Sequence, residues 1–121
     1  MRKILLFLAV SFMALGTNAA ISYGDYKSTP CISVMQVAET TMRNWQNGYS
    51  NKDMLLSSLK LGGNLSEKSS MDLSDAKLLT YRMATTAMKS PLHDDDVYKN
   101  IAISKFSSDY YSICEMKHNG L

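Results

Sequence analysis

The chain has little of what most enzymes and nucleic-acid-binding proteins need. Its 121 residues include two histidines, His93 and His118, two cysteines and one tryptophan. Two histidines leave few candidates for a general base, and no serine lies in the Gly-x-Ser-x-Gly pattern of a hydrolase nucleophile. The formal net charge is only +2, without the basic cluster that nucleic-acid binding requires. These scarcities argue against catalysis and against nucleic-acid recognition.

Long apolar runs are also scarce, and the one present lies at the N-terminus. Arg2 and Lys3 precede the mostly apolar residues 4–15, and small residues follow up to Ala19 and Ala20. This order is typical of a secretory signal peptide. Its apolar part would reach about 18 Å as a helix, short of the roughly 30 Å hydrocarbon core of a bilayer. We therefore expect cleavage near Ala19, a periplasmic or secreted location, and no stable membrane span afterwards.

Cleavage would leave about 102 residues, enough for one domain, with 11 basic and 11 acidic side chains. Both cysteines, Cys31 and Cys114, would remain, and an oxidising compartment favours their pairing. The alternative, a free catalytic thiol, needs a nearby base and an electropositive setting. We expect a signal peptide at 1–19, an extended lead-in at 20–29, a helical domain at 30–118 and a tail at 119–121.

Apolar residues recur at intervals of three and four, the period of an α-helix. The first helix should start at Pro30 and end at Gly48. A brief second helix should follow Ser50 and stop at Gly62, before a polar loop at 64–70. The apolar stripe expected on the first helix comprises Cys31, Met35, Ala38, Met42, Trp45 and Tyr49.

Two further helices are expected in the second half of the chain. The third should start near Asp72 or Ser74 and break at Pro91, and the fourth should run from 93–96 to about Lys117. Its expected stripe comprises Ala102, Phe106, Tyr110, Ile113 and Cys114.

Four helices with short connections favour antiparallel neighbours, which places the start of the first beside the end of the fourth. The sequence therefore predicts an all-α, small four-helix antiparallel bundle, with one disulfide joining Cys31 to Cys114. Closing an interval of 83 residues by a disulfide is expected to stabilise the fold by about 2 to 4 kcal/mol.

Nine methionines are many for a chain of this size, and methionine serves both irregular cores and adaptable binding surfaces. Met35, Met42 and Met83 lie on predicted apolar stripes and should be core residues. Other methionines, exposed together with tyrosines, would form a surface for a partner protein. The candidates for this surface are Met54, Met88, Tyr98 and Tyr111.

The run His93–Asp96 is the one cluster that suggests a metal site. Consecutive side chains at a helix start point about 100° apart and do not converge on one ion, and the chain lacks the spaced acids of a calcium loop. A capping role at the positive end of a helix is the simpler interpretation. We expect no metal, no cofactor and no catalytic residue.

Between its cysteines the chain resembles a group of small exported bacterial proteins, some encoded in prophages, that have no assigned activity. Members share a cysteine that opens the first helix, a Met-x-x-Arg-Gln-x-Gly segment, an Ala-aromatic-x-x-Pro break and a final Phe-x-x-x-aromatic-x-x-x-Cys. Trp45 stands here in place of the arginine, and Met88 in place of the first aromatic residue. The matching positions are Cys31, Met42, Gln46, Gly48, Ala87, Pro91, Phe106, Tyr110 and Cys114. The resemblance implies the bundle and the disulfide, and it implies no activity.

The leading functional hypothesis is a non-enzymatic module that binds an unidentified envelope or extracellular protein. A phage-linked role in exclusion or lysis control is a more specific version that rests on analogy alone. The first alternative is a periplasmic stress chaperone that resembles the small acid chaperones. The second is a hydrolase or metal-dependent enzyme, which would need a polar pocket near His93, His118 or Asp109.

Overall fold

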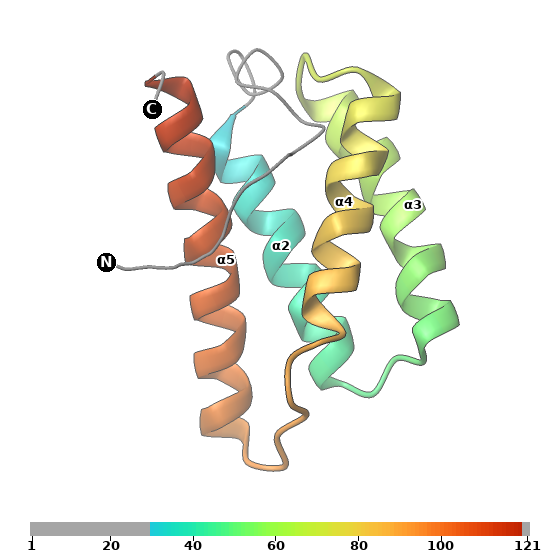
Figure 1. Cartoon of the computed structure of the whole chain (residues 1–121), viewed down its shortest axis with the longest axis vertical. Coiled ribbons are helices and arrows are strands. Elements are labelled where there is room, and N and C mark those ends of the chain that lie inside the picture. The colour runs from blue at the N-terminus through green and yellow to red at the C-terminus, as the bar shows by residue number, and fades with distance from the viewer. Residues whose placement is uncertain (1–29, 120–121) are drawn as a thin grey trace.

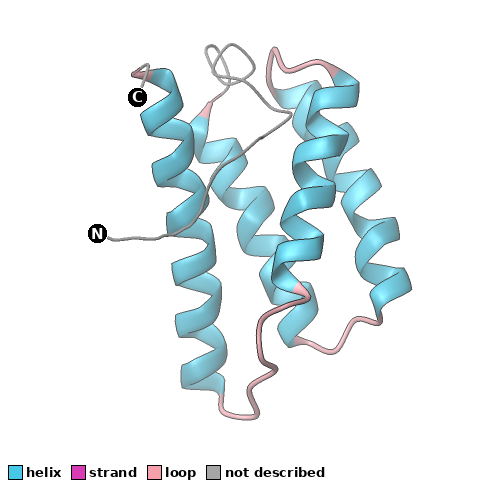
Figure 2. Cartoon of the chain, viewed as in Figure 1, coloured by secondary structure: helices cyan, strands magenta, loops and turns pink. Residues whose placement is uncertain are grey.

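The computed structural model describes residues 30–119. The predicted signal peptide, the lead-in at 20–29 and the last two residues lie outside this range. With the labels of Figure 1, the four helices are α2 (Cys31–Gln46), α3 (Asn51–Lys68), α4 (Leu73–Ala87) and α5 (Asp96–His118). They run alternately up and down, and the described residues contain helices and connections but no strand (Figures 1 and 2). The predicted all-α antiparallel bundle is confirmed.

Helix α2 lies at the centre of the arrangement. It packs against each of the other three helices, while α3 and α4 form a closely packed hairpin and α5 packs chiefly on α2 (Figure 1). The buried apolar side chains form one core, to which α2 contributes Cys31, Val34, Val37, Ala38 and Met42. Helix α5 is the longest but buries only four of its 23 residues: Ile103, Phe106, Ser107 and Cys114.

Local sequence signals set several helix ends where they were expected. Gly48 has a φ of +93°, which glycine adopts without a side-chain clash, and its N–H donates to the Trp45 carbonyl at 3.0 Å. The next N–H, of Tyr49, donates to the Asn44 carbonyl at 3.1 Å and completes a Schellman motif. Ser50 then caps α3 by accepting from the Asp53 N–H at 3.1 Å. The turn between α2 and α3 is thus encoded locally.

The predicted end of the second helix at Gly62 is wrong. Helix α3 continues through both glycines to Lys68, so most of the predicted loop at 64–70 is helical, and Leu65 is a fully buried core residue. A Cβ on Gly62 would lie 2.8 Å from both the Lys77 Cα and the Thr80 Oγ1 of α4. The glycine therefore permits two helices to approach closely and does not end one.

A hydrogen bond from a buried hydroxyl also stabilises the close approach of α3 and α4. Thr80 on α4 is fully buried, and its Oγ1 donates to the Ser58 carbonyl of α3 at 2.6 Å. Ser58 lies one turn before Gly62 on the same face of α3, so the hydrogen bond forms where the missing side chain leaves room. The α3–α4 hairpin thus combines close backbone approach with a satisfied polar group.

The predicted stripes have the right period but are rotated in places. Val34 and Val37 are more deeply buried than Met35, which is only partly buried. On α5, Ile103 is buried while the predicted core residue Ile113 is 40% exposed. The rotation arises because periodicity gives a helix its apolar side, whereas neighbouring helices decide which part of that side is covered.

Adjacent glycines provide a matched test of the α3–α4 contact. Gly62→Ala should destabilise the protein by about 1 to 3 kcal/mol, because the new methyl group meets the backbone of α4. Gly63→Ala meets no atom within 4 Å and should stabilise the helix by up to about 1 kcal/mol. Urea denaturation followed by circular dichroism measures both changes. Equal stabilisation by the two substitutions would contradict the packing described.

Candidate functional site

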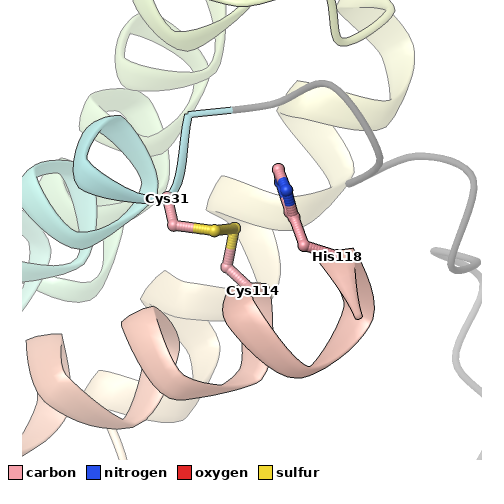
Figure 3. Close-up of side chains that lie close together, drawn as sticks. All are labelled: Cys31, Cys114 and His118. Carbon is pink, nitrogen blue, oxygen red and sulfur yellow. A yellow bond between two sulfur atoms is a disulfide. The ribbon is translucent and has the colours of Figure 1, made fainter. Parts of the chain in front are cut away.

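The two cysteines join the start of α2 to the end of α5, as predicted. The Cys31–Cys114 disulfide spans 83 residues of sequence with its Cα atoms 5.6 Å apart (Figure 3). Cys114 is fully buried and Cys31 is 6% exposed, so the bond lies inside the core. Because it uses both cysteines of the chain, no free thiol remains as a nucleophile in this state.

His118 lies beside this disulfide (Figure 3). One ligand atom from each of Cys31, Cys114 and His118 lies within 4.8 Å of the other two. His118 follows Cys114 by four residues, which places both side chains on one face of α5. The sequence pointed to His118 only as a residue near which an enzyme would need a polar pocket, and not as a neighbour of the two cysteines. The Cys-x-x-x-His spacing at a helix end was the signal that could have shown it.

At the other end of α2, an amide side chain fastens the connection that precedes α5. Gln46 is 3% exposed; its Nε2 donates to the Pro91 carbonyl at 2.9 Å, and its Oε1 accepts from the His93 N–H at 3.1 Å. The indole N–H of neighbouring Trp45 donates to the Ser90 carbonyl at 2.9 Å. These three hydrogen bonds, which we call the amide clamp, hold the connection against the C-terminal turn of α2.

A groove of about 200 Å³ lies beside the amide clamp, between the connection and α5. Its lining includes Ser90, His93 and Asp109, residue types that hydrolases use. Asp109, however, accepts from the Lys105 ammonium group at 3.0 Å in an exposed ion pair, and the His93 ring lies against Tyr98 with centroids 6.0 Å apart. Within residues 30–119, no hydrogen bond links the side chains of Ser90, His93 and Asp109. The groove therefore lacks an assembled nucleophile–base pair.

Helix α5 is also linked to α4 through a tyrosine. Burial raises the pKa of the Tyr110 phenol, and a side-chain hydrogen bond with Thr86 together with the nearby charge of Arg82 acts in the opposite direction. The Tyr110 ring packs against Phe106 with centroids 5.0 Å apart. The phenol is thus a neutral, structural contact between two helices.

The four side chains expected to form a partner surface are not brought together. Met54 is 1% exposed and belongs to the core, which corrects its assignment to an exposed cluster. Met88 and Tyr111 are partly buried and pack against that core. Tyr98 alone is strongly exposed, at 58%. Methionine content does not distinguish core from surface, because the burial of Met54 depends on the packing of α3 within the bundle.

Tyr98 instead belongs to an apolar surface at the start of α5. We call Leu92, Val97, Tyr98 and Ile101 the entry patch; each is between 55% and 63% exposed. The three helical members fall within one face, since positions three and four apart are neighbours on a helix. Leu92 directly precedes His93, whose ring contacts Tyr98, so the connection folds back towards the same face.

No helix among residues 30–119 is both long enough and apolar enough to cross a membrane. No protein-family model, curated protein or solved structure shows significant similarity to this chain.

The amide clamp can be tested by removing one side chain. Gln46→Leu should lower the free energy of unfolding by about 1 to 3 kcal/mol, because it leaves the Pro91 carbonyl and the His93 N–H without their partner. Gln36→Leu, on the exposed side of the same helix, is the matched control and should change stability by less than about 0.5 kcal/mol. Thermal unfolding of both variants checks this, and similar losses would show that Gln46 has no special role.

Proposed function

We propose that this chain is an exported, non-enzymatic helical module that binds another protein through the entry patch. The observation that carries the proposal is the strong exposure of Leu92, Val97, Tyr98 and Ile101, which lie at the start of α5 and in the connection directly before it. Tyrosine and large aliphatic residues are the side chains that supply most binding energy in protein interfaces when they become buried. The absence of an assembled nucleophile–base pair in the neighbouring groove is consistent with a binding role.

The surroundings of the entry patch indicate the chemistry of its partner. Asp94, Asp95 and Asp96 are exposed directly before Val97, and none of them forms an ion pair within the described part of the chain. An apolar centre with an acidic rim matches a partner segment that combines apolar with basic side chains. Charge complementarity of this kind gives orientation and a faster encounter, while the apolar centre supplies affinity.

Export is the second component of the proposal. The residue order at 1–19 supports it, and a disulfide between the two cysteines fits an oxidising compartment such as the periplasm or the cell exterior. In that setting the partner would be an envelope or extracellular protein.

Photo-crosslinking in the native host tests the binding role. A photoreactive phenylalanine analogue in place of Tyr98 should give one discrete adduct, which Ile101→Asp reduces at least about fivefold by removing apolar contact. The adduct should weaken at higher salt if the acidic rim contributes. The same analogue in place of Leu56, which is 56% exposed on α3, is the control and should give no such adduct. Absence of an adduct at position 98, or an identical one at position 56, contradicts the proposal.

The intact mass of the protein recovered from its host tests export separately. A mass that matches a start at Ala20, two hydrogens short until reduction, is the expected result. A full-length chain with two alkylatable thiols would contradict both the export and the disulfide in the cell.

A second candidate function is a periplasmic stress chaperone, and the exposure of the apolar entry patch is the observation that favours it. A chaperone of this class binds unfolded clients through exposed apolar surface, which the entry patch offers. An aggregation assay at about pH 3 distinguishes the two functions, since a partner-specific module should not protect a generic client.

A further inference from the structure

We propose that Cys31, Cys114 and His118 form a site for a zinc-class divalent ion when the disulfide is reduced. The disulfide and the metal site would be alternative ways to join the start of α2 to the end of α5. This inference is independent of the partner-binding proposal, because it concerns the opposite end of α5 from the entry patch.

The spacing of the three side chains is suitable for coordination. Their ligand atoms already lie within 4.8 Å of one another. In a tetrahedral zinc site with Zn–S of about 2.3 Å and Zn–N of about 2.0 Å, neighbouring ligand atoms are separated by roughly 3.5 to 3.8 Å. Once the S–S bond is broken, side-chain rotation can separate the two sulfurs to this distance while the Cα atoms stay near 5.6 Å apart. Three protein ligands would leave the fourth position for water.

The donor set also suits the burial of the site. Two thiolates and one neutral imidazole around a divalent cation give a complex with no net charge, which avoids the large penalty for burying an unpaired charge. Cys31 lies in the first turn of α2, where the positive end of the helix dipole favours a thiolate. Thiolate and imidazole ligands select zinc-class ions over magnesium and calcium, which prefer oxygen.

The change from disulfide to metal site requires a dithiol reductant. Thiol–disulfide exchange transfers two electrons and two protons to the S–S bond, so Cys31 and Cys114 become thiols while the reductant becomes a disulfide. Binding of the divalent ion then releases the two thiol protons. Reoxidation by a disulfide-forming oxidant would expel the ion and restore the S–S bond.

The rest of the fold favours survival of the site after reduction. The amide clamp still holds the connection before α5 against the end of α2, and Phe106 and Ile103 still anchor α5 in the core. These contacts keep the two cysteines on facing helices, so the metal would meet a largely prearranged set of ligands.

Cobalt(II) titration of the reduced full mature chain is the test, because Co²⁺ reports thiolate ligation and tetrahedral geometry in its absorption spectrum. We expect a saturable one-to-one complex with thiolate-to-cobalt charge-transfer and tetrahedral d–d bands, which Zn²⁺ displaces. Removing a residue that only hydrogen-bonds to a metal ligand can already weaken metal binding by about tenfold. His118→Ala removes a ligand itself, so it should weaken binding by more than about tenfold. His93→Ala, which alters the other histidine, should leave the affinity unchanged, and the oxidised protein should not bind.

Thermal unfolding provides a second readout that is independent of cobalt. Zn²⁺ should raise the Tm of the reduced protein by at least about 5 °C and leave that of the oxidised protein unchanged, because the ion binds only the folded dithiol form. If the reduced chain unfolds without metal, Zn²⁺ should restore its helical circular dichroism. The proposal is overturned if reduced protein shows no tetrahedral spectrum and no Zn²⁺ stabilisation, or if His118→Ala binds as tightly as the parent.

Discussion

Helix α5 is held against α2 by a specific contact near each of its two ends. It is the longest helix, yet it buries few side chains and packs chiefly on a single neighbour. Hydrophobic burial is roughly proportional to the apolar area removed from water, so this helix gains less from packing than its length suggests. The Cys31–Cys114 disulfide at one end and the amide clamp at the other add to the limited stabilisation that this helix gains from burial. The amide clamp in particular holds the connection that leads into the entry patch.

The two fastenings differ in chemistry and therefore in what can release them. The disulfide restricts the unfolded chain and responds to reductant. The amide clamp pairs the buried Gln46 amide with the part-buried Pro91 carbonyl and His93 N–H, and it does not respond to redox state. Because Gln46 contacts Pro91 and His93 directly, it also sets the path of the segment that leads into the entry patch. A structural side chain on α2 thereby positions the surface proposed to bind a partner on α5.

Features that depend only on residues close together along the chain could be predicted from the sequence. The Schellman motif at Gly48 and the serine cap at Ser50 need only a few residues and their backbone, and the four-helix order follows from apolar periodicity. The disulfide followed from the same order, because an antiparallel arrangement brings the first and last helix ends together. The helix end predicted at Gly62 was wrong because the role of this glycine depends on residues distant along the chain. A glycine that ends a helix and a glycine that accommodates a neighbouring helix are identical in a single sequence, and only the position of Lys77 and Thr80 separates them.

The sequence by itself determined the number and order of the helices, their antiparallel course and the pairing of the cysteines, since these depend on local propensity, apolar period and chain connectivity. Tertiary structure alone decided which apolar residues remain exposed, so Met54 entered the core while Tyr98 and its neighbours stayed at the surface. It also decided that His118 lies beside the disulfide and that Gln46 spans the connection before α5. These contacts join residues distant along the chain, and their geometry depends on how far each helix rotates and shifts against the next, which no local pattern specifies.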